Sequence, residues 1–201
     1  MEFKKRLAPG KLFKHSVFAI CLAGLLFCWL PVKSQDGNLS LETVSDPEVT
    51  FLFNTIQKFQ SGISVQNAIN LRVTAVDVNW DLYVYAETDV PGLWNEVLSY
   101  SDYGLHPESG LLELRFRNAA NTPNIDGFFP IDDISNPAYI IGSPGADPDI
   151  NCPEMGTNTP GNYIDQPQCY EFTVDMRIQP GFDHRPGLYT LNVMYVIVED
   201  L

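Results

Sequence analysis

The chain has 201 residues, 45% of them hydrophobic, and a formal net charge of −13 at pH 7. Six of the 12 basic residues and one of the 25 acidic residues lie in the first 34 positions, so the remaining 167 residues carry six positive against 24 negative charges, a net of about −18. A polyanion of this kind is repelled by phosphate backbones and anionic membrane surfaces, which argues against nucleic acid as a partner.

The amino terminus has the pattern of a secretory signal peptide. Five basic residues precede an apolar run at 17–32, and small residues follow it. We therefore predict a signal peptide at 1–34 and a secreted chain that begins near Gln35. A membrane anchor is the alternative, but the run is only 16 residues long and contains Pro31, whereas about 20 residues are needed to span a bilayer. We expect no membrane span after cleavage.

The rest of the chain shows a period of two, which is typical of half-buried strands. We predict a flexible N-terminal arm at 35–48 and a single domain at 49–201. Strands are expected at 49–53, 68–76, 80–86, 111–117, 170–178 and 188–198. The last two are joined by a short link rich in Pro and Gly, which predicts that they pair antiparallel. Residues 95–100 are expected to form a short helical turn.

Together these segments predict an all-β fold. Strands separated by turn residues, with no helices long enough to cross between them, favour an antiparallel, immunoglobulin-like β-sandwich. A long Pro-rich insertion at 118–169 interrupts the strands. Its apolar residues are expected to pack as short edge strands or across an open end of the sandwich. They are Phe128, Phe129, Tyr139, Ile140 and Ile141.

A disulfide is expected to clamp this insertion. Cys152 and Cys169 are the two cysteines that remain after signal-peptide cleavage, and an even pair in an exported chain is most simply a disulfide. A zinc site is the alternative, but two thiols without a nearby His do not resemble one. The clamped loop would also bind a ligand if its polar residues point outward. These are Asn158, Asn162, Tyr163 and Asp165.

Oxygen ligands within the insertion suggest a calcium site. Asp147, Asp149 and Asn151 alternate in the way that an EF-hand loop begins, and the later positions of such a loop are not matched. The alternative is an Asx-rich turn that leads into the disulfide. We expect no other cofactor.

Aromatic residues supply a second candidate site. Along 80–85 the alternation places Trp80 on one face with two aliphatic residues, and Tyr83 and Tyr85 on the other face. If the first face is core, the two tyrosines form an outward platform for a sugar ring or another subunit. The alternative is that the insertion at 118–169 covers them.

The ending PGLYTLNVMYVIVED resembles the closing strand of bacterial surface β-sandwich modules, which include fimbrial-type subunits, spore-coat-U-like domains and WxL-like domains. Residues 68–86 are similar to a central hairpin in such modules. The resemblance implies a non-enzymatic role in adhesion, pilus assembly or wall attachment, in the periplasm or on the outer surface of a bacterium. The immunoglobulin cysteine pattern is not met, because both cysteines follow Trp80.

An enzyme is not expected from the motifs. The chain contains no HExxH, no GxSxG and no phosphate-binding glycine loop, and after cleavage it has only His106 and His184 as histidines. A hydrolase that uses paired carboxylates stays open as an alternative. We therefore expect a structural or assembly module that self-associates or binds other surface proteins. The alternative is a carbohydrate- or protein-binding module that uses Tyr83, Tyr85 and the cystine loop.

Overall fold

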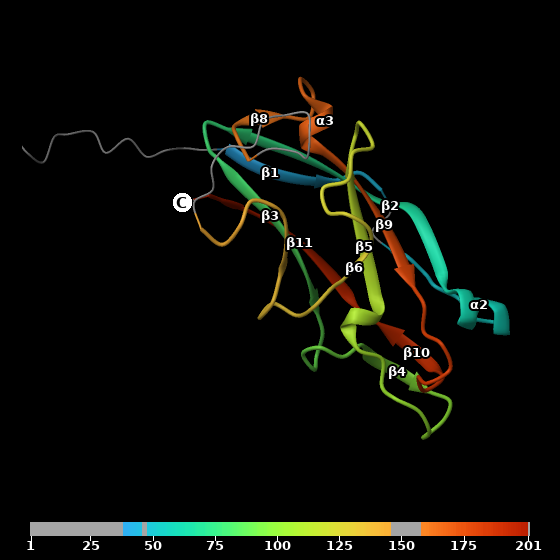
Figure 1. Cartoon of the computed structure of the whole chain (residues 1–201). Coiled ribbons are helices and arrows are strands. Elements are labelled where there is room, and N and C mark those ends of the chain that lie inside the picture. Colours follow the sequence, from blue (N-terminus) through green and yellow to red (C-terminus); the bar gives the residue numbers. More distant parts are fainter. Residues whose placement is uncertain (1–37, 46–47, 146–157, 201) are drawn as a thin grey trace, which may run out of the picture. The chain divides into compact units, whose positions relative to one another are not determined.

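The computed structural model describes residues 38–45, 48–145 and 158–200. Strands dominate this part of the chain (Figure 1). The strands are β1 (Asn38–Thr43), β2 (Ile63–Val76), β3 (Trp80–Glu87), β4 (Asn95–Ser99), β5 (Leu112–Asn118), β6 (Phe129–Pro130), β7 (Ala138–Ile141), β8 (Gly161–Asn162), β9 (Glu171–Ile178), β10 (Gly187–Thr190) and β11 (Asn192–Glu199). The short helices are α2 (Ile56–Ser61), α3 (Pro167–Tyr170) and the 3-10 turn η1 (Ser109–Leu111).

The strands form three sheets, and all of their pairings are antiparallel. The large sheet has the order β1-β2-β9-β5-β6, with β8 beside β2, and the small sheet has the order β11-β3-β7. A two-stranded ribbon of β10 and β4 lies at the lower end of Figure 1, opposite β8 and α3. The predicted all-β, sandwich-like fold class is confirmed, and its immunoglobulin-like subtype stays a prediction.

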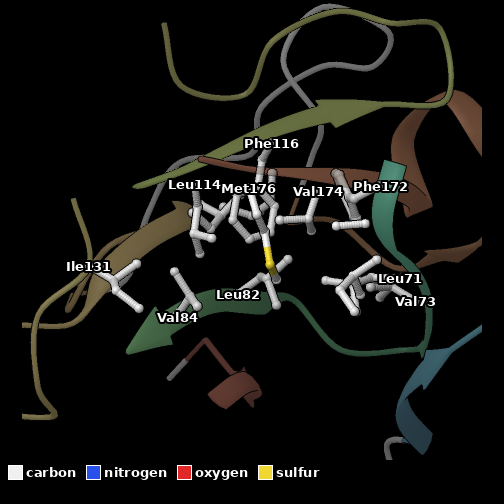
Figure 2. Close-up of a cluster of buried hydrophobic side chains, with 14 of the residues drawn as sticks. Leu71, Val73, Leu82, Val84, Leu114, Phe116, Ile131, Phe172, Val174 and Met176 are labelled. Carbon is white, nitrogen blue, oxygen red and sulfur yellow. The ribbon is translucent and has the colours of Figure 1, made fainter. Parts of the chain in front are cut away.

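The hydrophobic core lies between the large and small sheets. Leu82 and Val84 of β3 face side chains of β5 and β9, among them Phe116 and Val174 (Figure 2). The alternation in each strand explains this arrangement, because every second residue of β3, β5 and β9 is buried. Truncating one such side chain to alanine typically costs about 2 to 5 kcal/mol.

Trp80 closes one end of this core. Its side chain is fully buried, and its ring lies 5.8 Å from that of Tyr170 and 6.3 Å from that of Phe172. Its indole Nε1 donates a hydrogen bond of 3.0 Å to the carbonyl of Thr159, so the polar edge is satisfied. The prediction that Trp80 faces the core is confirmed.

Two local predictions are wrong. Residues 49–53 form no strand; Val49, Phe51 and Phe53 pack against the core, but their backbone joins no ladder. Alternation of apolar and polar residues indicates which side chains are buried, but a segment becomes a strand only if it also pairs with the edge of a neighbouring strand. Residues 95–100 form no helical turn, because 95–99 are strand β4, which pairs with β10.

The predicted pairing of the last two strands is also wrong. β9 lies between β2 and β5 in the large sheet, whereas β11 pairs with β3 in the small sheet. The segment 188–198 is divided at Leu191 into β10 and β11. Likewise, 68–86 is not a hairpin, because the chain crosses from the large sheet to the small sheet near Asp77, which has a φ of 60°. The alternation of residues along a strand predicts which face is buried, but it does not predict which other strand it pairs with.

The segment 35–48, predicted to be a flexible arm, contains a strand. Residues 38–43 form β1, which pairs with β2 of the same chain over its whole length. Leu39 and Leu41 pack against the core, and this burial favours the strand over a free arm. The sandwich therefore begins before residue 49.

Segment 118–169 contributes short strands at the sheet edges, whereas Phe128 belongs to neither of them and its ring lies against the Arg115 and Arg177 guanidinium groups. β6 contains Phe129 and borders the large sheet; β7 contains Tyr139, Ile140 and Ile141 and borders the small sheet. Both strands come from the segment between the longer β5 and β9. In β7, Ile140 and Ile141 are buried and extend the core to the edge of the sandwich.

In the described part of the chain, no helix is long and apolar enough to cross a membrane. The predicted signal peptide at 1–34 lies outside the described residues.

Candidate functional site

Three tyrosines lie together on the outer face of the small sheet. Tyr83 and Tyr85 project from β3 on the side opposite the core, and Tyr139 projects from the neighbouring β7. The ring centroids of Tyr83 and Tyr139 are 5.2 Å apart, and those of Tyr83 and Tyr85 are 6.3 Å apart. We call this group the tyrosine face. It confirms the prediction that Tyr83 and Tyr85 point away from the core.

Strand β11 extends the tyrosine face with aliphatic side chains. Met194 lies opposite Tyr85, and Val196 lies opposite Tyr83. All of these side chains are half-buried, so the face is an apolar surface with tyrosine hydroxyls at its border. The insertion at 118–169, which was the alternative cover for Tyr83 and Tyr85, covers them in part, because Tyr139 belongs to it.

A small acidic pocket adjoins the tyrosine face. Its volume is about 190 Å³. It is lined by Asp81, Tyr139, Ser143, Pro144, Gly145, Val198, Glu199 and Asp200. Burial raises the pKa of the Tyr139 hydroxyl, with smaller contributions from the negative charge of Asp81 and from Tyr83, so this hydroxyl stays protonated at neutral pH and can donate a hydrogen bond.

Gly142 lies beside this pocket and has a φ of 74°. A Cβ at this position would lie 1.9 Å from Oδ1 of Asp81. The absence of a side chain at Gly142 thus allows the buried Asp81 to sit against the backbone at the end of β7.

The loop residues predicted to bind a ligand are arranged differently. Asn158 is fully buried and its Nδ2 donates to Oδ2 of Asp200 at 3.2 Å, so it does not meet the condition for ligand binding, which was that it points outward. Its position beside the first residue of β3 explains this, because its carbonyl accepts a hydrogen bond from Trp80 N. Asn162 Oδ1 accepts from the backbone N–H groups of Ile164 and Asp165, which is an Asx turn.

Tyr163 and Asp165 lie in the same turn. The Arg72 guanidinium lies 4.9 Å from the centre of the Tyr163 ring, and Asp165 Oδ2 accepts a hydrogen bond of 2.7 Å from Asn162 Nδ2. These contacts within the protein account for the polar residues of the turn without a ligand. We therefore place the candidate site on the tyrosine face and not on this loop.

The predicted disulfide and calcium site depend on residues outside the described part. Cys169 is fully buried in α3, but Cys152 lies outside the described residues, so their pairing stays a prediction. The calcium ligands Asp147, Asp149 and Asn151 also lie outside it. Within the described ranges, no group of three or more His, Cys, Asp and Glu side chains is arranged to hold a metal ion.

Sequence reasoning missed a second polar cluster on the outer face of the large sheet. Arg115 and Arg117 of β5 lie beside Asp175 of β9, which is fully buried although it faces away from the core. The signal in the sequence is the alternation Arg-x-Arg within an apolar strand, with an acid in another strand. Only the register of β5 against β9 brings them together.

Comparison with known proteins adds no identification. A scan against protein-family models gives no match, and a search of curated proteins gives none either.

Proposed function

We propose that this protein is an exported, non-catalytic binding module, and that its tyrosine face binds a glycan. The observation that carries the proposal is the packing of Tyr83, Tyr85 and Tyr139 into one outward surface beside a pocket lined by carboxylates. Aromatic rings offer a rigid apolar surface with a polar tip, which suits a ligand that is apolar on one side and rich in hydroxyls on the other.

The two parts of the surface match the two sides of a sugar ring. The apolar side of the ring would lie on the tyrosines. Its hydroxyls would donate to carboxylates of the acidic pocket, such as Glu199. The pocket, at about 190 Å³, is smaller than the roughly 300 to 1,000 Å³ of sites that enclose a drug-sized ligand. It therefore fits one sugar unit, and the rest of the chain would extend over the tyrosine face.

The absence of catalysis is part of the proposal. Both histidines in the described part of the chain lie away from this surface. His106 Nε2 is 4.0 Å from Glu96 Oε2 of the ribbon, and the backbone of His184 pairs with that of Leu105. If the protein were a carboxylate hydrolase, the acidic pocket would be its site. Incubation with a bound glycan followed by mass analysis distinguishes the two functions, because a binding module releases the glycan intact.

Alanine substitution on the tyrosine face tests the proposal. A glycan array first identifies a ligand, and calorimetry then compares the wild type with Tyr83→Ala and Tyr85→Ala. We expect at least a tenfold loss of affinity, equivalent to about 1.4 kcal/mol, for each. Tyr103→Ala is the matched control, because Tyr103 is 87% exposed and does not belong to the face. An array without a hit, or unchanged affinity of both variants, would refute the proposal.

A second candidate function is assembly, and strand β11 favours it. This strand is an edge of the small sheet, and its eight residues contain no Pro, Lys or Arg. Long apolar edge strands are able to pair with a further strand, and here the partner would be a second copy of the chain. Residues 38–43 do not offer a strand for this pairing, because β1 already pairs with β2 of its own chain.

Sedimentation measurements test the assembly function. We expect the wild type to dimerise with increasing concentration and Val196→Lys to stay monomeric, because a charge on the edge strand disfavours pairing. Val97→Lys in the ribbon is the control, since Val97 is exposed and lies outside the small sheet. A wild type that is monomeric at all concentrations would exclude this function.

A further inference from the structure

An open cleft lies on the outer face of the large sheet and belongs to neither surface used above. Its volume is about 460 Å³. We call it the arginine cleft, and its lining residues are Gln66, Arg115, Arg117, Asn121, Pro123 and Gly127. Arg115 and Arg117 are two residues apart in β5, so both side chains project from the same face of the strand.

A buried carboxylate holds both arginines. Asp175 has no exposed surface, and its Oδ2 accepts from Arg115 Nε at 2.9 Å and Nη2 at 2.6 Å. Arg117 donates from Nε to Oδ2 at 3.0 Å and from Nη2 to Oδ1 at 2.8 Å. Two positive charges thus face one negative charge, and the cluster has a surplus of one positive charge.

Arg115 is only partly used by this cluster. Its Nε and Nη2 bind Asp175, and its Nη1 has no hydrogen-bond acceptor among the residues that the structure describes. The edge of the guanidinium formed by Nη1 and Nη2 is therefore available to a ligand. The Arg115 side chain is 31% exposed. The Phe128 ring lies 4.8 Å from the Arg115 guanidinium, which restrains the plane of this edge.

Arg117 is held more completely. Its Nη2 donates to Asn67 Oδ1 at 3.0 Å, and its Nη1 donates to Asn121 Oδ1. The side chain of Arg117 therefore has little freedom, and it contributes a fixed positive charge to the wall of the cleft. A fixed charge of this kind loses little entropy when a ligand binds.

The backbone around the cleft adopts unusual conformations. Asn67 has a φ of 53° and lies where the register of β2 against β9 shifts, and Asn121 has a φ of 67°. They are two of the three non-glycine residues with positive φ in the described part of the chain. Bulges and such conformations recur next to binding sites, where they direct a side chain. Here both direct an amide oxygen to Arg117.

We propose that the arginine cleft binds the carboxylate group of an anionic ligand. The available edge of Arg115 presents two parallel N–H groups, which is the geometry that a planar carboxylate accepts in a bidentate manner. The single surplus charge matches a monoanion. Gln66, exposed on the cleft wall, would donate a further hydrogen bond from its side-chain amide.

The distribution of charge supports this assignment. Of the six Lys and Arg residues in 35–201, four lie on this face of the large sheet, namely Arg72, Arg115, Arg117 and Arg177. Arg72 and Arg177 are paired one to one with Glu171 and Glu113, so the surplus lies at the cleft. The remaining surface is acidic and repels anions. The proposal is independent of the tyrosine face.

Titration with small anions tests the proposal. The probes are sodium acetate, sodium galacturonate and sodium sulfate, with galactose as the uncharged reference, and the readout is the NMR signal of the Arg115 Nε–H group. We expect both carboxylates to shift this signal with saturation in the millimolar range, and galactose to leave it unchanged. Tighter binding of galacturonate than acetate would identify a sugar acid as the source of the carboxylate, and equal binding would identify a small carboxylate.

Two variants separate binding from folding. Gln66→Glu places a negative charge on the cleft wall, and we expect at least tenfold weaker binding with unchanged thermal stability. Gln57→Glu is the matched control, because Gln57 is exposed in α2 and does not line the cleft. Arg115→Lys is expected to abolish the preference for carboxylate over sulfate. Unchanged binding in Gln66→Glu, or equal binding of sulfate and carboxylates by the wild type, would overturn the proposal.

Discussion

Replacing Asp175 by Asn tests how strongly the buried carboxylate stabilises the large sheet. The substitution keeps the size of the side chain and removes its charge, so that the guanidinium groups of Arg115 and Arg117 lose their common counter-ion. Breaking a buried ion pair typically costs 3 to 5 kcal/mol. Both arginines retain contact with water, since their side chains are 31% and 20% exposed. We therefore expect a loss near the lower limit, about 3 kcal/mol.

Urea denaturation at pH 7 measures this loss. With a denaturant slope of roughly 2 kcal/mol/M, a destabilisation of about 3 kcal/mol lowers the midpoint by roughly 1.5 M urea. Glu171→Gln is the matched control on the same face of β9. Glu171 pairs with one arginine, and both side chains are partly exposed, so we expect a loss below about 1 kcal/mol.

The pH dependence provides a second test. Burial raises the pKa of Asp175, but the hydrogen bonds from Arg117, the Asn67 N–H and Arg115 outweigh it and hold this pKa below the ordinary value of 3.8. A lowered folded-state pKa contributes stability that is complete above the unfolded-state pKa and is lost as the pH falls through the folded-state pKa. The difference between wild type and Asp175→Asn should be constant from pH 7 to about pH 5 and shrink below about pH 4.

Two results would refute this reasoning. A loss no larger than that of Glu171→Gln at pH 7 would show that the carboxylate is not stabilising. A loss that stays the same down to pH 3 would show that its charge is not responsible.

Three further substitutions have expected outcomes. Gly142→Ala should lower the free energy of unfolding by about 3 kcal/mol, because the new Cβ would clash with Asp81 at a backbone φ of 74°. Gly181→Ala is the control: Gly181 has a φ of 63° and open space around it, so we expect a loss of about 1 kcal/mol. Equal losses of the two variants in urea denaturation would show that the clash with Asp81 does not occur. Tyr195→Phe should raise the free energy of unfolding, measured by thermal denaturation, by about 1 kcal/mol, because the buried Tyr195 hydroxyl has no hydrogen-bond partner within the described ranges. A lower free energy of unfolding in this variant would show that the hydroxyl does have a partner. Cys152→Ser should cost about 3 kcal/mol if Cys152 and Cys169 are paired. A mass that does not change on reduction of the wild type would contradict that pairing.

The strand alternation predicted most of the large strands correctly. The predicted strands 80–86 and 170–178 correspond to β3 and β9 with the predicted faces, although Tyr170 belongs to α3, because burial of alternate side chains is a local property. The outward direction of Tyr83 and Tyr85 follows from the same alternation. Residues 49–53 show the limit of this reasoning, since they alternate inward without joining a sheet.

Strand partners were not predictable from alternation. β9 and β11 are separated in the sequence only by the short β10 and lie in different sheets, whereas β5 and β9 pair across a long insertion. An alternating strand can pair with any edge that offers the complementary face, and only the packing of the whole core selects one. Asn158, a candidate ligand-binding residue, is buried for the same reason, because β3 begins beside it.

The sequence by itself thus determined the all-β class, the acidic surface and the faces of the main strands. The tertiary structure decided which side chains from distant strands meet. Tyr139 joins Tyr83 through the pairing of β7 with β3, and Asp175 joins Arg115 through the pairing of β9 with β5. These contacts depend on register between segments far apart in the chain, and register is set by the burial of the shared core and not by the local pattern.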